Sequence, residues 1–578
     1  MLCFSVVNFD LELGHALEYT YPPVPFSDAE QKTLCFSAFP DSNSYDQTGD
    51  SVFIFRMRNG EFTQKLYLKQ YQECNFTRQD QFDAATTGFL PIETDGYTYG
   101  HVFFRQQQDS EIRRGFFQKA LVLLTPYPWP GLFSHLLALL GPAVMDQFVA
   151  NRSNSLSGTE ILCKSSLLET ACVEISQWPP PPSSLTAEVS FETISLQLPF
   201  FSTKQYFSFP PYSLFPQLYP LKSRNQDQTT FESTKPIVCN PGKFYQMFHR
   251  SLDSIWTCWE LMVLGEPIAV MSDTPKACSD AVLALVELIK PMPFGGDYRP
   301  YFTIQDSDFT SLTNRGRQPP QGVVLGVTNR VFSKILEHWP HVLEIGKQKK
   351  SYSIMDDISI GMNGMQIDEL DMSIEKCKFK HKPFFSKDRK LLKAIFEVGV
   401  KVKGIDAVNN SLRYHFSELT QRFLQPVNRY FDSLVMGNQN QMNFDCLRTK
   451  PEIKPFRQDD FLKIIDSSPP TLPVASKRPV YEFYKLFLLS SNFAAWLQQK
   501  TDETYRDWRN HYLDVLCTQD IEIWAKQSLK KGDMVGCIDL LMRLKEELVS
   551  DQGFSFLDAL FFIFCCKWHD NSTCAFIK

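Results

Sequence analysis

The chain has 578 residues, a net charge of −6 and a pI near 6.0. A single hydrophobic core rarely extends beyond about 250–300 residues, so this length predicts two to four modules. The 43% hydrophobic and 21% charged residues are close to globular averages and exclude wholesale disorder. The slightly acidic balance gives no general field for nucleic acid or an anionic membrane, so either would need a local basic patch.

The 15 cysteines are odd in number and include no C-x-x-C pair. They indicate thiols in a reducing compartment, and therefore a cytoplasmic protein, rather than a disulfide framework or zinc ligands. The first residues, MLCFSVVNFD, lack the basic region and long apolar run of a secretory signal and predict a first strand instead. Because no uninterrupted run of 18 apolar residues occurs, no membrane span is predicted.

Residues 1–178 are predicted to form a first module built on an antiparallel sheet. Apolar stretches separated by glycine and asparagine turns are typical of such strands. Five strands are expected, in the stretches CFSVVNF, HALEYTY, SVFIFRMR, GYTYGHVFFRQ and FFQKALVLL. An apolar helix, LFSHLLALL, is predicted to follow from Leu132.

Residues 179–240 are predicted to be a proline-rich linker. The four consecutive prolines of WPPPPSS cannot continue a helix or join a β ladder, so they indicate a module boundary. A second stretch rich in proline and phenylalanine ends at Pro220. At most one strand is expected between them.

Residues 241–350 predict a central open α/β module, because helices and strands alternate there. A helix around Trp259 should end at Gly265, and an apolar helix should begin at Thr274. Strands are expected in PIAVM, in YFTI and in GVVLGV, followed by a helix through NRVFSKILEHW.

The remainder of the chain is predicted to be a loop and then helices. Residues 351–387 are polar without a clear period and indicate an insert loop, whereas residues 388–505 carry apolar residues at three- and four-residue spacing. Residues 506–578 are expected to be a helical region with a cysteine-rich tail. In that tail, Cys565 and Cys566 could be acylated as a membrane anchor or buried in a terminal helix, and the sequence leaves both open.

Motifs for cofactor or metal chemistry are missing from the sequence. Neither phosphate-binding glycine loop, G-x-x-x-x-G-K-[ST] or G-x-G-x-x-G, occurs, and there is no H-E-x-x-H or G-x-S-x-G. We therefore predict no catalytic residue, no cofactor and no metal.

Residues 295–309, GGDYRPYFTIQDSDF, gather carboxylates that raise the question of an active site. Asp297, Asp306 and Asp308 could serve acid–base chemistry or hold a divalent ion, but no third ligand or histidine accompanies them. A structural or interfacial role is the better interpretation, with Arg299 pairing with a carboxylate and the glycine pair forming a turn.

Several motifs together resemble the tripartite DENN-domain proteins, and most closely the sixth DENN-domain-containing subfamily. The likeness covers about residues 1–545, and the end after Val549 departs from it. The stretches that carry it are FDLELG, FPDSNS, YGHVFFRQ, RGFFQKALVL, WELMVLGEP, DYRPYFTIQDSDF, VVLGVTNRVF and LSSNFAAW.

The resemblance implies an α/β fold, α+β overall: an N-terminal longin-like antiparallel module, a central open α/β DENN module and a largely helical downstream module. It further implies guanine-nucleotide exchange on a Rab GTPase, in its GDP-bound or nucleotide-free form, without covalent chemistry. The expected setting is cytoplasmic and peripheral on recycling endosomes or related vesicles, with peripheral membrane association left open and no nucleic-acid partner. The residues predicted at the Rab-facing rim are Asp297, Arg299, Tyr301, Asp306, Asp308 and Asn329, the last bracing the adjoining turn. For Tyr301 and Asn329 a purely structural role is left open, because residues at strand ends often serve only packing and caps.

Two other readings remain. One is a non-exchanging trafficking scaffold. The other is a GTPase-activating protein in which Arg105 acts as an arginine finger, although a residue ending a strand is also expected to pair with a neighbouring acid.

Overall fold

The computed structural model describes most of the chain, which divides into two compact units. One comprises residues 1–426 with 462–496, and the other residues 427–461 with 497–578. The described residues are 3–10, 14–41, 49–60, 96–110, 115–126, 129–154, 166–176, 186–190, 204–208, 237–238, 243–347, 372–396, 400–436, 452–469, 472 and 477–518. The module boundaries expected from the sequence stay predictions.

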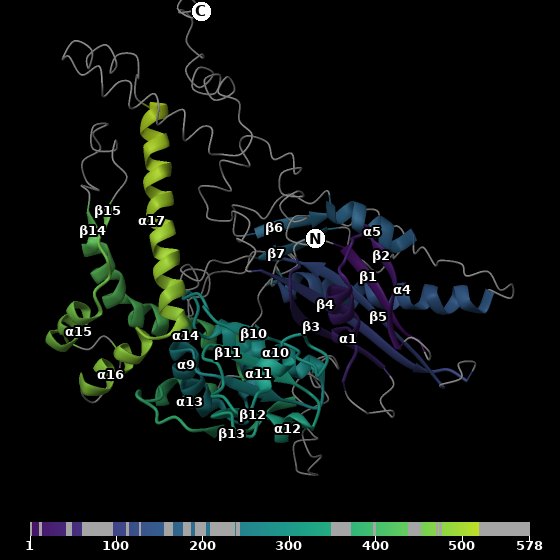
Figure 1. The fold of residues 1–578 in the computed structure, drawn as a ribbon, viewed down its shortest axis with the longest axis horizontal. Coiled ribbons are helices and arrows are strands. Elements are labelled where there is room, and N and C mark those ends of the chain that lie inside the picture. The colour runs from purple at the N-terminus through teal and green to yellow at the C-terminus, as the bar shows by residue number, and fades with distance from the viewer. Residues whose placement is uncertain are drawn as a thin grey trace, which may run out of the picture. The chain divides into compact units, whose positions relative to one another are not determined.

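The first unit begins with a five-stranded antiparallel sheet (Figure 1). All five predicted strands are present, in the spatial order β2-β1-β5-β4-β3. Their bounds are β1 Cys3–Asp10, β2 Gly14–Tyr21, β3 Gly49–Arg58, β4 Tyr97–Gln108 and β5 Phe116–Thr125. Together with the second sheet described below, this confirms the predicted mixed α/β fold class.

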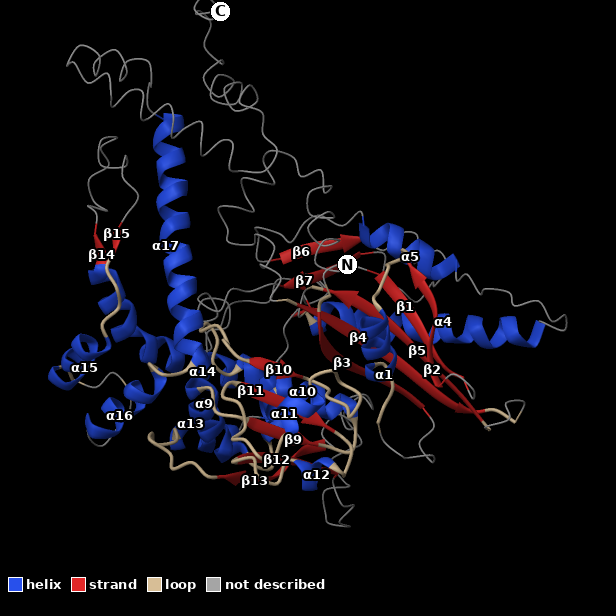
Figure 2. Cartoon of the chain, in the orientation of Figure 1, coloured by secondary structure: helices blue, strands red, loops and turns tan. Residues whose placement is uncertain are grey.

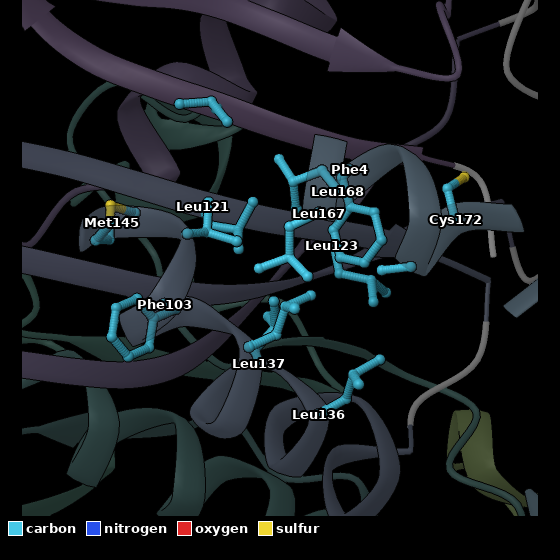
Figure 3. Close-up of a cluster of buried hydrophobic side chains, with 14 of the residues drawn as sticks. Phe4, Phe103, Leu121, Leu123, Leu136, Leu137, Met145, Leu167, Leu168 and Cys172 are labelled. Carbon is cyan, nitrogen blue, oxygen red and sulfur yellow. The ribbon is translucent and has the colours of Figure 1, made fainter. Parts of the chain in front are cut away.

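Helices cover both faces of this first sheet. Leu121 and Leu123 belong to a core shared with α4 (Pro130–Asn154) and α5 (Ser166–Ser176). Figure 3 shows them grouped with Leu136 and Leu137 of α4 and with Leu167 and Leu168 of α5. Val122 and Leu124 point the other way, into a core shared with α1 (Asp28–Ser37). This alternation is the period of two that a strand buried on both faces requires.

Helix α4 is longer than the sequence predicted. Within the described residues it is the one helix long and apolar enough to cross a membrane by length and composition, although the chain has no uninterrupted apolar run of that length. Half of its most apolar segment is buried inside the protein. Leu137, Leu140 and Val144 pack in the core of the first sheet, so burial of this face explains the helix's apolar character.

The second sheet of the first unit confirms the predicted open α/β module. Its order is β10-β11-β9-β12-β13, with four parallel strands and an antiparallel edge strand, β13. The bounds are β9 Ile268–Met271, β10 Asp297–Arg299, β11 Val323–Val327, β12 His341–Lys347 and β13 Met372–Phe379.

Three local predictions in this part are wrong. The strand expected at YFTI lies earlier, at β10, because Pro300 has no N–H to donate to a ladder and Tyr301 turns toward the first sheet. The helix expected through NRVFSKILEHW is one short turn, α12 (Phe332–Ile335), because the backbone leaves the helical region at Leu336, where φ is −95° and ψ is 15°. Residues 372–379 of the predicted insert loop form β13, and residues 348–371 lie outside the described part.

One helix, α10 (Pro275–Glu287), contacts both sheets of the first unit: β3 on one side and β9, β10 and β11 on the other. As predicted, it begins after Thr274, whose hydroxyl accepts from the Ala277 N–H and caps the first turn. The neighbouring α9 (Ile255–Leu264) is buried throughout and ends at Gly265, where φ is 67°. Shorter helices in this part are α8 Phe244–Phe248, η2 Leu252–Ser254, α11 Phe309–Thr313 and α13 Arg389–Ala394.

The predicted linker contains more strand than expected. The short strands β6 (Thr186–Ser190), β7 (Lys204–Ser208) and β8 (Ile237–Val238) form a three-stranded sheet in that order. We expected one strand, because segments of two to five residues between prolines give too few alternations to recognise. The four-proline run itself lies outside the described residues.

The described part of the chain after residue 388 is largely helical, as predicted (Figure 2). In the first unit, Phe423, near the middle of α14, packs on Trp259, Phe483 and Tyr484. The bounds are α14 Val400–Leu434, α15 Gln458–Ser467, α16 Lys477–Phe487 and α17 Ser491–Thr518, with a two-residue ladder of β14 Val435–Met436 and β15 Glu452–Ile453. Cys565 and Cys566 lie outside the described residues.

The start of α17 docks on the turns that precede β10 and β11. Asn492 is fully buried: its side-chain Nδ2 donates to the carbonyls of Met262 and Val263, and its Oδ1 accepts from the Gly295 N–H. Any side chain at Gly295 would meet the Ser491 carbonyl within 2.3 Å. Three separate sequence motifs, WELMVLGEP, DYRPYFTIQDSDF with its preceding glycines, and LSSNFAAW, therefore meet at one junction.

Candidate functional site

Arg299 lies at the centre of the segment that sequence analysis singled out. Its Nε is 3.0 Å from Oδ1 of Asp297, its Nη2 is 2.6 Å from Oδ2 of Asp308, and its Nη1 is 3.5 Å from Oδ2 of Asp306. Although only 1% of Arg299 is exposed, three carboxylates surround it. Burial lowers the pKa of Arg299, but Asp297 and then Asp306 raise it by more. The net pKa therefore lies above its ordinary value, and the guanidinium stays charged.

Two arginines reach the same carboxylates from β3 of the first sheet. Arg56 Nη1 donates to Asp297 Oδ1 at 3.1 Å and to the Tyr298 carbonyl at 3.2 Å. Arg58 Nε lies 3.0 Å from Asp308 Oδ2. Arginine and aspartate thus alternate across the contact between the two sheets. We call this group the arginine–aspartate clasp; its members are Arg56, Arg58, Asp297, Arg299, Asp306 and Asp308.

The clasp leaves its aspartates neutralised. Asp306 is buried, its Oδ1 accepts from the Asp308 N–H at 2.9 Å, and burial raises its pKa while Arg299 opposes that rise. Asp297 faces three arginines and Asp308 faces two. Within the described residues, no group of three or more histidines, cysteines and acids is placed to hold a metal ion. The clasp can therefore join surfaces and balance charge.

A second link between the sheets is Tyr301. Its hydroxyl donates to the Phe39 carbonyl at 3.0 Å and accepts from the Asp41 N–H at 2.5 Å. Its ring lies edge-on to Phe53 of β3 at 5.4 Å. Burial, followed by the nearby Asp41 charge, raises the pKa of Tyr301, so it remains a protonated donor.

Asn329 stands in the turn after β11. Its Oδ1 accepts from the Val331 N–H at 3.0 Å, and its side chain also hydrogen-bonds Asp41. Burial raises the pKa of Asp41, and the Asn329 bond opposes the rise. The carboxyl ends of β10 and β11 are where open α/β sheets commonly bind ligands. Here the residues that follow both strands hold the chain's own loop at Phe39 and Asp41.

We expect Tyr301→Phe to lower the free energy of unfolding by about 1–3 kcal/mol, because the buried Phe39 carbonyl and Asp41 N–H both lose their partner. The phenyl ring keeps the contact with Phe53. Chemical denaturation followed by tryptophan fluorescence measures the change. Tyr245→Phe is a matched control, since a partly exposed hydroxyl can be replaced by water; an equal loss in both variants would contradict the role of Tyr301.

The structure brings all six sequence-predicted residues to the contact between the two sheets: five in the segment 297–308, and Asn329 through Asp41. Their partner-binding role stays a prediction, and burial limits what a partner could touch. Arg299 and Tyr301 are covered, whereas Asp308 and Asn329 are partly exposed. Sequence reasoning missed Arg56 and Arg58, for which the signal is the two-residue spacing of arginines at the end of the apolar strand SVFIFRMR.

Arg105 is held by acids, the alternative that the sequence favoured. Its Nε and Nη2 lie 2.6 and 2.7 Å from the two Asp50 oxygens, and its Nη1 lies 2.6 Å from Asp146 Oδ1. The Asp50 hydrogen bond raises the pKa of Arg105, burial lowers it, and the net direction is upward. An arginine finger would have to leave both partners.

We call the first sheet with its helices the first lobe and the second sheet with its helices the second lobe. Together with the downstream helices, they form the layout that the resemblance to DENN-domain proteins implied. No protein-family model matches the chain. Among curated proteins, it is 33% identical to the protein DENND6B of Mus musculus, over 95% of this chain and 87% of that one. The protein DENND6A of Gallus gallus is also 33% identical, over 95% and 86%, and the DENND6 homolog of Dictyostelium discoideum is 30% identical, over 95% and 77%. The chain belongs to the DENND6 family of DENN-domain proteins.

Proposed function

We propose that the chain is a guanine-nucleotide exchange factor for a Rab GTPase, a cytoplasmic regulator acting peripherally on recycling endosomes. The observation that carries the proposal is its similarity to DENND6 proteins over 95% of its length. DENN-domain proteins are generally exchange factors for Rab GTPases.

Exchange needs a shaped surface and no covalent chemistry. A factor that binds the nucleotide-free GTPase more tightly than the nucleotide-bound form must, by reciprocity, weaken nucleotide binding by the same factor. The GTPase holds its nucleotide through switch segments ordered around the phosphates and Mg²⁺. Both lobes must therefore present a fixed surface to those switches, and the arginine–aspartate clasp and Tyr301 fix the lobes to each other.

The exposed border of the lobe contact is the surface we assign to the GTPase. Arg58 is 59% exposed in its side chain and reaches Asp308. Asp308 directly precedes α11, and the ring of Phe309, the first residue of that helix, lies 6.0 Å from the ring of Phe332. Val331, the residue before Phe332, is exposed. We call Arg58, Asp308, Asn329 and Val331 the junction rim. These four residues come from both lobes.

The test is release of labelled GDP from a panel of purified Rab GTPases by the full chain. We expect faster release from at least one of them. The double change Arg58→Ala and Val331→Ser should slow that release at least about tenfold, because it removes one cation and one apolar side chain from the surface assigned to the GTPase. Exposed rim residues are the appropriate targets, since removing the buried Asp306 would instead disturb the clasp.

The matched control is Lys485→Ala with Leu489→Ser, which also removes one exposed cation and one exposed aliphatic side chain. It should release GDP like the parent. Faster hydrolysis without release would favour the GTPase-activating alternative, and Rab binding without either effect would favour the scaffold. If no GTPase in a complete panel releases GDP faster, the exchange proposal is wrong.

A further inference from the structure

One segment of the first unit is strongly basic, although the whole chain carries a net charge of −6. Between residues 376 and 393 there are eight lysines and arginines and one acid, Asp388. All eight basic residues are exposed. We call this group the basic edge; its members are Lys376, Lys378, Lys380, Lys382, Lys387, Arg389, Lys390 and Lys393.

The basic edge begins on the outermost strand of the second sheet. Lys376 and Lys378 are two residues apart in β13, with Lys380 next in the same alternation, so their side chains leave the same face about 7 Å from each other. Lys376 pairs with Glu344 across the strand at 3.2 Å. Among the described residues, Lys378, Lys380 and Lys382 have no ion-pair partner, so their charge is available.

The loop after β13 is fixed in place by a buried carboxylate. Glu260 of α9 accepts from the backbone N–H groups of Phe384 and Phe385, each at 2.9 Å, and lies 2.7 Å from His381 Nε2. The Phe385 ring packs on Phe483 at 4.8 Å. Because this loop is anchored from inside, Lys380 and Lys382 on either side of His381 are displayed at a defined position.

The second half of the basic edge is α13 and the turn that continues it. Arg389, Lys393 and Phe396 follow at spacings of four and three residues, which places them on one side of a helix. Phe396 is 68% exposed, one of the most exposed large apolar side chains in the described residues. An exposed aromatic ring among cations is typical of a helix surface that enters the interfacial region of a bilayer.

We propose that the basic edge is a docking surface for a bilayer rich in anionic phospholipid headgroups, with Phe396 entering the interface. Four to eight clustered lysines and arginines are the usual requirement for such binding. A single-stranded nucleic acid would instead need several stacking rings, and here Phe384 and Phe385 turn inward onto Phe483. Because the whole chain is slightly acidic, binding to an anionic membrane needs a local basic patch, and the basic edge is such a patch. This proposal does not depend on the exchange activity.

The position of the basic edge is compatible with a GTPase on the junction rim. β13 is the edge strand opposite β10, which carries the clasp, so four strand spacings, about 19 Å, separate the two edges of the sheet. A bilayer and a protein partner would then engage different edges of the same sheet. Rab GTPases act on membranes. This arrangement would hold the proposed GTPase partner and the proposed membrane contact on the same sheet.

The experiment is co-sedimentation of the full chain with vesicles of phosphatidylcholine alone, or with phosphatidylserine or a phosphoinositide added. We expect binding to the anionic vesicles only, weakening as salt rises from about 0.1 to 0.5 M because screening shortens the range of surface charge. The triple change Lys378→Glu, Lys380→Glu and Lys382→Glu should lower anionic-vesicle binding at least about tenfold. Phe396→Ser should lower it severalfold while keeping the salt dependence.

The matched control is the triple change Lys454→Glu, Lys463→Glu and Lys485→Glu, three exposed lysines outside the basic edge with the same total change in charge. It should retain at least half of the parent's binding. Equal losses in the two triple variants would show a general charge effect and overturn the proposal, as would absence of anionic-vesicle binding. Tight binding of single-stranded RNA by a chain that ignores these vesicles would overturn it too, in favour of a nucleic-acid partner. GDP release in solution should be the same for both triple variants, which separates this proposal from the exchange activity.

Discussion

Replacing Arg299 with methionine is expected to lower the free energy of unfolding by about 3–5 kcal/mol, the usual effect of removing one partner from a buried ion cluster. Methionine preserves much of the length and apolar stem but no charge. Arg56 and Arg58 would still reach Asp297 and Asp308, whereas Asp306 has no other ion pair among the described residues. A buried carboxylate would then remain without a cation. The midpoint of denaturation by urea, followed by tryptophan fluorescence, measures the loss.

Arg58→Met is the matched control, because Arg58 contacts the same aspartates from the exposed side of the clasp. An exposed ion pair contributes at most about 1 kcal/mol, so this variant should stay within that range of the parent. Equal losses of stability in Arg299→Met and Arg58→Met would show that burial does not determine the strength of the clasp. The clasp would then not be what holds the two lobes together.

The penalty for Arg299→Met should also depend on pH. Burial raises the pKa of Asp306, and Arg299 is the main influence that lowers it. Without Arg299 the folded-state pKa of Asp306 rises further above its unfolded value. Such a carboxyl stabilises the fold below its unfolded pKa, and that stability is lost as pH rises through the folded pKa. The difference between variant and parent should therefore be smaller at pH 5 than at pH 7.5, and a constant difference would contradict this origin.

Much of the fold could be predicted from sequence because the buried strands carry their signal locally. SVFIFRMR and GYTYGHVFFRQ are rich in β-branched and aromatic residues and have turn residues at their ends, and both form the strands expected of them. β13 was missed for a physical reason. It is an edge strand in which, among the side chains the structure describes, only Ser373 and Ile374 are fully buried, and exposed lysines follow where an apolar period would mark a strand. The same lysines form the basic edge.

The site could be predicted only in part, since its contacts join distant residues. The charged residues of segment 297–308 are visible in the sequence, and pairing of Arg299 with a carboxylate was expected. Nothing in the spacing relates Arg56 to Asp297, or Phe39 to Tyr301, because those contacts arise only when the first and second sheets pack on α10. Residues separated by more than two hundred positions can be placed together by topology and not by local pattern.

Gly296→Ala is expected to destabilise the first unit by about 3 kcal/mol or more, among the larger effects of a single methyl group. A Cβ at this position would lie 1.9 Å from the Gly322 carbonyl oxygen and 2.7 Å from its carbon. Both are backbone atoms, so no rotamer change can relieve the clash. The Gly322 carbonyl accepts from the Asp297 N–H at 2.8 Å, and the Gly322 N–H donates to Gly265 at 2.6 Å. Shifting Gly322 would therefore disturb the start of both β10 and β11.

The consequence should reach the clasp, because β10 begins at Asp297 and holds Arg299 two residues later. Loss of stability in Gly296→Ala should accordingly be accompanied by loss of GDP release. Gly316→Ala is the matched control: it adds the same methyl group in an exposed turn, where the nearest contact is the Asn314 side-chain oxygen at 3.2 Å. Its stability should change by less than about 0.5 kcal/mol. A Gly296→Ala protein as stable as Gly316→Ala would mean that the turns before β10 and β11 can separate freely, and the rigid support inferred for the clasp would be wrong.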